Sequence, residues 1–143
     1  MREQVEDALG VRRRDAASRI DDTNGDITDS RLDEDGDELD TLIVTDEPLP
    51  TGVWLEARIV GIMNFEDDGE MDHKVIAVPA DDRTTGDRLK TLDDLGERWK
   101  QKVTFHFEHY KDLKKPGTTK VTGWGDVEAA KAMIKECIAR YKK

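Results

Sequence analysis

The sequence is poor in cysteine and has no long apolar run, and each shortage excludes a class of protein. Cys137 is the single cysteine, so neither an internal disulfide nor a zinc site made of several thiolates can form. A reducing compartment is therefore expected. No apolar run approaches the roughly 20 residues of a membrane-spanning helix, and Met1-Arg2-Glu3-Gln4 does not resemble the start of a secretory signal. We predict a cytoplasmic protein that makes no membrane contact.

Positive charge is also in short supply. The 143 residues include 23 Lys and Arg against 33 Asp and Glu, which gives a formal net charge of −10. Binding free nucleic acid needs a basic surface, so the composition argues against that partner. An acidic protein can still bind pyrophosphate or a nucleotide when metal ions bridge the negative charges. With 36% hydrophobic and 39% charged residues, the length fits one domain with a modest core.

The first part of the chain differs in composition from the remainder. Residues 1–20 are charged, with apolar side chains too sparse for a strong amphipathic stripe, and residues 21–34 are rich in Asp, Thr, Asn, Gly and Ser. Such compositions favour loops or disorder over packed structure. We predict that residues 1–28 are a divergent segment without a full set of barrel strands. Residues 29–143 are then expected to form the folded domain.

Strands dominate the first half of that domain. Apolar runs and alternating patterns predict strands at residues 41–45, 53–60, 73–79 and 120–124. Gly61 is expected to mark a bulge or a bend.

Two helices are expected towards the C-terminus. Apolar residues spaced three and four apart predict a helix over residues 91–113, with Thr91 and Asp94 as an approximate capping box. Asp126 is expected to cap a last helix, with Cys137 on its apolar face. Because most strands precede the helices, we expect a small barrel or an antiparallel sheet with helices at its side.

Two acidic clusters each precede an apolar run. Asp35-Gly36-Asp37-Glu38-Leu39-Asp40 comes before residues 41–44, and residues 67–74 come before residues 75–78. Acidic loops that lead into neighbouring strands can converge at one mouth of a sheet or barrel. Their carboxylates would suit hard cations such as Mg²⁺, Ca²⁺ and Mn²⁺. Lysines beside them could hold an anion, so the combination indicates phosphate chemistry.

Other interpretations of the acidic clusters are weaker. Acidic runs often form only a solvated face. An EF-hand calcium loop needs acidic residues at positions one, three and five and glycine at position six. Placing Gly36 at position six puts Arg31 at position one, and placing Gly25 there puts Ile20 at position one. Both registers fail.

A series of motifs follows in collinear order. They are the run from Asp35 to Asp40, Pro48-Leu49-Pro50-Thr51-Gly52, Gly61, the run from Asp67 to Lys74, Ile76-Ala77-Val78-Pro79, the run from Phe107 to Leu113, and Val121-Thr122-Gly123-Trp124. Together they resemble family I soluble inorganic pyrophosphatases over roughly residues 29–143. The resemblance implies a mainly β fold, an oligonucleotide/oligosaccharide-binding-like barrel with two flanking α-helices. It also implies Mg²⁺-dependent hydrolysis of inorganic pyrophosphate to two phosphates and assembly into a homo-oligomer.

The resemblance also assigns roles, position by position within the motifs. The residues that resemble magnesium ligands are Asp35, Asp40 and Asp72, together with Asp67 for ions that accompany the substrate. The residues that resemble phosphate contacts are Lys74, Tyr110 and Lys111. Asp37 resembles the base that takes a proton from the attacking water. These types fit the chemistry, because phosphoryl transfer needs charge neutralisation and positioning more than covalent catalysis.

The chain departs from the family pattern at its beginning. The family places earlier strands before the aspartate run, with a glutamate pair, a lysine and an arginine at the site, and a Tyr-Gly dipeptide a short way upstream. Here Asn24-Gly25-Asp26 stands near that position, and no tyrosine precedes Tyr110. We therefore expect weakened hydrolysis. The alternative is a non-catalytic, truncated pyrophosphatase-like protein that binds metal or a partner.

Overall fold

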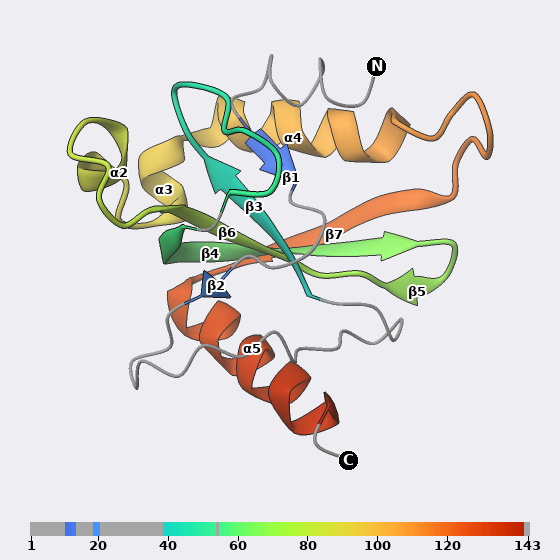
Figure 1. Cartoon of the computed structure of the whole chain (residues 1–143). Helices are drawn as coiled ribbons and strands as arrows, with labels where there is room; N and C mark the ends of the chain where they lie inside the picture. Colours follow the sequence, from blue (N-terminus) through green and yellow to red (C-terminus); the bar gives the residue numbers. More distant parts are fainter. Residues whose placement is uncertain (1–10, 14–18, 21–38, 54, 142–143) are drawn as a thin grey trace.

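A computed structural model describes residues 11–13, 19–20, 39–53 and 55–141 of the chain (Figure 1). Two predicted site residues, Asp35 and Asp37, lie outside this part, as does most of the segment 1–28. The boundary proposed at residues 28 and 29 stays a prediction. Within the described residues, no helix has the length and apolar character needed to cross a membrane.

The strands of the described residues form one seven-stranded sheet, with β4 (Glu56–Asp67) as its longest strand. The strand order is β1 (Val11–Arg13), β3 (Asp40–Val44), β6 (Lys74–Pro79), β4 and β2 (Arg19–Ile20). In addition, β4 pairs with β5 (Glu70–Met71) and with β7 (Thr119–Gly125). The β3–β6 and β2–β4 pairs are parallel, and the remaining pairs are antiparallel. The sheet is not closed, so the predicted mainly β class is confirmed in an open, barrel-like form.

Gly61, where the sequence predicted a bulge or a bend, lies within β4. The pairing of β4 with β6 shifts register between Ile59 and Gly61, as expected of a bulge. A Cβ at Gly61 would overlap the side chain of Leu92 and lie 2.8 Å from the carbonyl oxygen of Gly125. The predicted bulge is therefore confirmed, and the close packing around it requires glycine.

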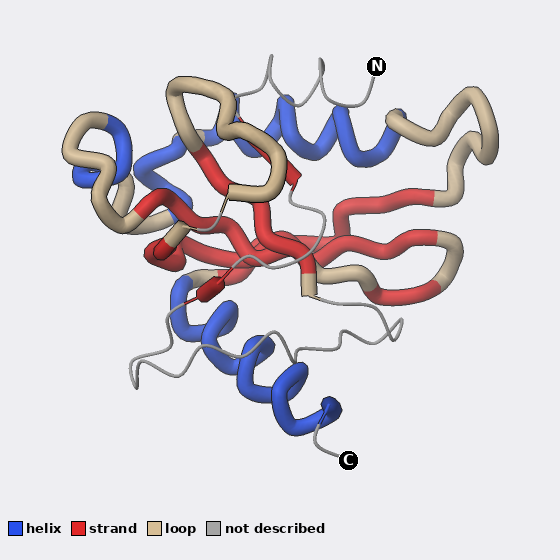
Figure 2. Tube along the Cα trace, viewed as in Figure 1, coloured by secondary structure: helices blue, strands red, loops and turns tan. Residues whose placement is uncertain are grey.

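The sheet is covered on both faces, by α4 (Glu97–His109) on one and α5 (Val127–Tyr141) on the other (Figures 1 and 2). The core beneath α4 includes Leu42, Phe65, Ile76, Val103 and Phe107. The core beneath α5 includes Ile62, Val75, Ala130, Ile134 and Cys137. Neighbours in β6 thus point to opposite cores, which explains why its sequence is continuously apolar.

The predicted helix over residues 91–113 is divided in the structure. A short α3 (Leu92–Leu95) ends at Gly96, whose φ of 82° is readily adopted only by glycine, and α4 follows. The Asp94 carboxylate accepts hydrogen bonds from the backbone N–H groups of Lys90 and Thr91, at 2.8 and 2.9 Å. The predicted capping role of Asp94 is confirmed, whereas the single continuous helix is wrong.

The last helix begins as expected. The Asp126 carboxylate accepts a 2.8 Å hydrogen bond from the backbone N–H of Ala129, and Cys137 is a buried thiol on the inner face. A further short helix, α2 (Thr85–Arg88), was not predicted, and neither were β1, β2 and β5.

Candidate active site

Strand pairing places two of the predicted site residues opposite each other. Asp40 begins β3, Lys74 begins β6, and these positions are partners in the parallel β3–β6 register. Asp72 lies in the link between β5 and β6, where its backbone N–H donates a 2.9 Å hydrogen bond to the carbonyl of Phe65. The three side chains therefore gather at one end of the sheet, and we call Asp40, Asp72 and Lys74 the Lys74 cluster.

The ammonium group of Lys74 links the two carboxylates of this cluster. Its Nζ lies 2.8 Å from Oδ2 of Asp40 and 2.8 Å from Oδ1 of Asp72. The Lys74 side chain is completely buried, while each carboxylate side chain retains 14% of its accessible surface. Two charge-assisted hydrogen bonds therefore compensate for the removal of the ammonium from water.

Two aromatic rings also lie close to the same ammonium. Lys74 Nζ lies 5.2 Å from the ring centroid of Phe65 on β4 and 5.8 Å from that of Phe107 on α4. The two rings meet edge to face with centroids 5.4 Å apart. A cation near ring faces is stabilised by the ring quadrupole, the more so when water is excluded.

A second ion pair lies at the end of β4 and is partly exposed. Lys111 pairs with Asp67, and the two side chains retain 29% and 20% of their accessible surface. Burial lowers the pKa of Lys111, but the hydrogen bond with Asp67 and the electrostatic interactions with Tyr110 and Asp67 outweigh it and raise the pKa above its usual value. Lys111 is therefore an ammonium at neutral pH.

Tyr110 connects the second pair to the Lys74 cluster. Its ring centroid lies 5.9 Å from that of Phe107, which itself borders the Lys74 ammonium, and the Lys111 Nζ lies 5.5 Å from the Tyr110 ring. The predicted site residues that the structure describes thus fall on one continuous set of contacts. They come from β3, β4, the β5–β6 link, β6 and the end of α4.

A further ion pair, which the sequence did not predict, involves the residue next to Asp67 in the sequence. Asp68 and Lys115 lie 2.8 Å apart, and the hydrogen bond with Lys115 and its charge hold the pKa of Asp68 below its ordinary value. Sequence reasoning missed this pair, and it missed that Phe65 and Phe107 border the ammonium. The sequence placed Phe107 in the apolar stripe of a predicted helix and in a family motif, but predicted no contact with Lys74.

The donor set of this corner fits a hard divalent cation. Asp40 and Asp72 converge on a single nitrogen, and carboxylate oxygens are the preferred ligands of Mg²⁺. Among the described residues alone, no group of three or more His, Cys, Asp or Glu is arranged to hold a metal ion. The predicted third ligand Asp35 and the predicted base Asp37 lie outside those residues.

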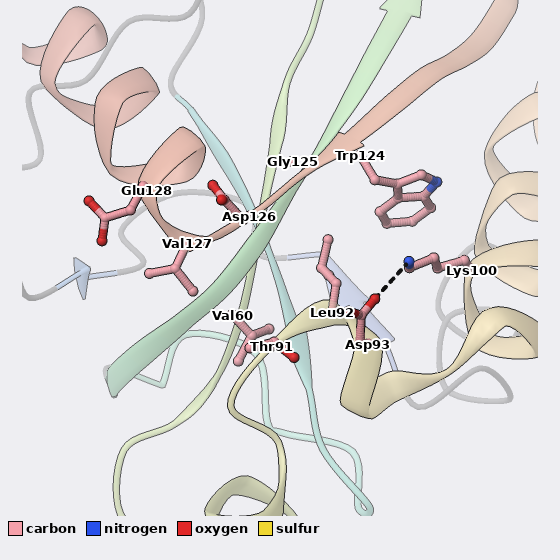
Figure 3. Close-up of a pocket in the computed structure, with 10 residues that line it drawn as sticks. All are labelled: Val60, Thr91, Leu92, Asp93, Lys100, Trp124, Gly125, Asp126, Val127 and Glu128. Atoms are coloured by element: carbon pink, nitrogen blue, oxygen red, sulfur yellow. Dashed lines mark ion pairs between the residues drawn. The ribbon is translucent and has the colours of Figure 1, made fainter.

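A pocket of about 380 Å³ lies beside Val60 of β4, between α3 and the start of α5 (Figure 3). Its walls include Val60, Leu92, Trp124 and Val127, and a 3.7 Å ion pair between Lys100 and Asp93 borders it. None of the predicted site residues lines this pocket. The predicted site residues that the structure describes therefore lie outside this pocket.

The fold and this corner define a class of protein: a mainly β domain with carboxylates and lysines suited to divalent cations and phosphate groups. The family model described as inorganic pyrophosphatase matches residues 19–142. The chain belongs to the inorganic pyrophosphatase family.

Relatives in sequence and in structure agree with this assignment. An inorganic pyrophosphatase of Neisseria meningitidis serogroup B is 59% identical over 121 residues, covering 85% of this chain and 68% of the relative. The Haemophilus influenzae inorganic pyrophosphatase is 54% identical over 121 residues, covering 85% of this chain and 69% of the relative. The crystal structure of an inorganic pyrophosphatase from Neisseria gonorrhoeae superposes with a TM-score of 0.77 at 42% identity, covering 97% of this chain and 94% of that one.

Proposed function

We propose that this protein hydrolyses inorganic pyrophosphate to two phosphates with Mg²⁺ as its metal. The observation that carries the proposal is the Lys74 cluster of Asp40, Asp72 and Lys74 within a chain of this family. Asp40 at the start of β3 and Asp72 in the β5–β6 link supply convergent carboxylates, and carboxylate oxygens are the ligands that a hard divalent cation prefers. No observation on the described residues favours the non-catalytic alternative.

The chain's own residues would divide the work as follows. Asp40 and Asp72, with Asp35, would hold Mg²⁺, and Asp67 would contact ions that arrive with the substrate. Mg²⁺ bound in this way neutralises phosphate charge and makes a bound water more acidic.

The remaining roles are proton transfer and substrate binding. Asp37 would accept the proton of the attacking water, whose oxygen forms a bond to one phosphorus while the bridging P–O bond breaks. Tyr110 would donate its O–H to a phosphate oxygen, and Lys111 would supply a compact positive charge. Lys74 was predicted to contact phosphate as well, and a different role for it is argued below.

A phosphate-release assay with pyrophosphate and Mg²⁺ tests the function directly. The proposal requires turnover that depends on both, and Asp37→Asn should abolish it while Mg²⁺ binding by calorimetry is retained. Lys115→Met is a matched control, because it removes an exposed lysine that pairs with Asp68 and has no proposed catalytic role. No release by a folded, metal-bound protein would favour the non-catalytic alternative.

Mg²⁺ is also expected to stabilise the fold. Clustered carboxylates repel one another in the metal-free protein, and an ion that binds only the native state shifts the equilibrium towards it. An unchanged melting temperature at millimolar Mg²⁺ would contradict the metal site.

Self-association and a cytoplasmic location complete the proposal. Phe105 on α4 retains 67% of its accessible surface, and its ring lies tilted beside that of His109 with centroids 4.4 Å apart, so an apolar group on this helix is available to a second copy. Sedimentation of the protein and of Phe105→Ser tests the association. A reducing compartment agrees with a single cysteine, Cys137, that forms no disulfide.

A further inference from the structure

Lys74 is an unusual residue to find in a protein interior. Its side chain has no accessible surface, although lysine is among the residues least often fully buried. An ammonium without water needs compensating partners, and Lys74 has two carboxylates at 2.8 Å and two aromatic rings within 6 Å. These partners come from β3, β4, the β5–β6 link and α4, so the position of the ammonium is fixed from several directions.

The surroundings of Lys74 do not suit direct contact with a substrate. A side chain that touches an incoming phosphate must be reachable from solvent, and Lys111, with 29% of its side chain exposed, meets this condition. Lys74 does not, because its side chain has no accessible surface and its ammonium is bound by Asp40 and Asp72 beside the rings of Phe65 and Phe107.

We propose that Lys74 is a positioning residue: its ammonium fixes Asp40 and Asp72 as a convergent pair of metal-ligating carboxylates and does not itself contact phosphate. The inference rests on the function proposed above. A carboxylate has two oxygens with about four lone-pair sites, so it can accept a hydrogen bond from an ammonium and still ligate a cation. Lys74 bonds one oxygen of each carboxylate, which sets the orientation of both planes.

The ammonium of Lys74 also reduces the electrostatic repulsion between Asp40 and Asp72. Two carboxylates fixed beside each other repel, and a single ammonium between them reduces this repulsion without cancelling the net negative charge. A residual negative charge is what a divalent cation needs. Groups that orient metal ligands in this way typically change metal affinity or activity by about 10–100-fold when removed.

Lys74→Met is the central variant, because methionine keeps an unbranched apolar chain between the rings and removes the charge. We expect its dissociation constant for Mg²⁺, measured by calorimetry without substrate, to rise about 10–100-fold. At saturating Mg²⁺ the KM for pyrophosphate should stay within about twofold. A residue that contacts phosphate directly would give the reverse pattern, with unchanged Mg²⁺ affinity and a raised KM, and that result would overturn the proposal.

Lys74→Arg provides the test of rescue and also covers the case in which Lys74→Met does not fold. Arginine keeps the positive charge and can bond both carboxylates, so it should recover most of the Mg²⁺ affinity relative to Lys74→Met. If Lys74→Met does not fold, Lys74→Arg must bind Mg²⁺ within about tenfold of the unsubstituted protein. A folded Lys74→Arg with unchanged Mg²⁺ affinity and a raised KM for pyrophosphate counts against the proposal.

Lys115→Met is the control, since it breaks a surface ion pair with Asp68 and should leave both Mg²⁺ affinity and KM unchanged. The failures of the two proposals are distinguishable. Weakened Mg²⁺ binding by Lys74→Met in a protein without pyrophosphatase activity refutes the function and supports the positioning role. Normal Mg²⁺ binding by Lys74→Met in an active protein supports the function and refutes the positioning role.

Discussion

Lys74 and Lys111 each pair with a carboxylate predicted to bind metal, yet they occupy different surroundings. Lys74 is fully buried, bonds two carboxylates and lies near two aromatic rings. Lys111 pairs with one carboxylate and retains 29% of its side-chain surface. The same residue type therefore meets two physical requirements: the buried ammonium must be permanently paired, whereas the exposed one can exchange its partner for a phosphate at little desolvation cost.

The largest expected effect is on stability, at Lys74. Lys74→Met in metal-free buffer leaves two carboxylates in close proximity without their cation, and breaking a buried ion pair typically costs about 3–5 kcal/mol. We expect a loss of this order in the free energy of unfolding measured with urea and a chelator. Saturating Mg²⁺ should recover part of it, because the metal replaces the missing positive charge. A loss no greater than that of Lys115→Met would remove the distinction between buried and exposed lysines.

Lys111→Met tests the partly exposed lysine of the comparison. A partly exposed ion pair contributes about 0–1 kcal/mol, so the free energy of unfolding should change little. If Lys111 stabilises charge on a phosphate, kcat/KM for pyrophosphate should fall by about a hundredfold. Activity and urea unfolding measured on the same preparation separate the two effects. A variant that loses stability and keeps its turnover would reverse the roles assigned to the two lysines.

Phe107→Leu tests how far the rings contribute to the buried ammonium. Leucine fills much of the same volume beneath α4, so packing alone predicts a cost below about 1.5 kcal/mol. The ring also approaches Lys74 at 5.8 Å and Phe65 at 5.4 Å, and both contacts would be lost. A double-mutant cycle of Phe107→Leu with Lys74→Met should therefore give a coupling energy of about 0.5–2 kcal/mol. Strict additivity would show that the rings only pack.

Much of this arrangement could be predicted from the sequence, and the part that could not has a clear physical reason. The apolar run of β6, the capping role of Asp94 and the apolar stripe carrying Val103 and Phe107 are local patterns, and the structure confirms them. The approach of Asp40 to Lys74 depends on the register of two strands whose contacting side chains are 34 positions apart. No local pattern fixes such a register.

The burial of Lys74 and the division of the helix at Gly96 were missed for related reasons. Asp72-His73-Lys74 is a polar sequence, and the burial of its ammonium depends on residues distant along the chain, among them Phe65 and Phe107, whose ring centroids lie 5.2 and 5.8 Å from it. The apolar spacing from Leu95 to Phe107 continues through the break, because α3 and α4 pack on the same core. Periodicity reports which residues face a core and does not report whether the backbone is continuous.

The smallest expected effect is on the pH dependence of stability, and it concerns Asp68, which forms an exposed ion pair with Lys115. Its pKa lies below the ordinary value of 3.8 because Lys115 donates a hydrogen bond to the carboxylate and adds a favourable charge. The native state therefore favours the ionised form. The resulting stability is present above the unfolded-state pKa and is lost as the pH falls through the lower folded-state pKa. Asp68→Asn cannot ionise, so its free energy of unfolding should decline slightly less steeply than that of the unsubstituted protein.

Urea unfolding at several pH values between about 6 and 3 measures this difference. Because Asp68 and Lys115 are both more than half exposed, the effect should shrink further in high salt. An acid dependence that is the same in both proteins would show that this surface pair contributes nothing, as many exposed pairs do. A difference as large as that produced at Lys74 would instead mean that exposure does not separate the two kinds of lysine in this corner.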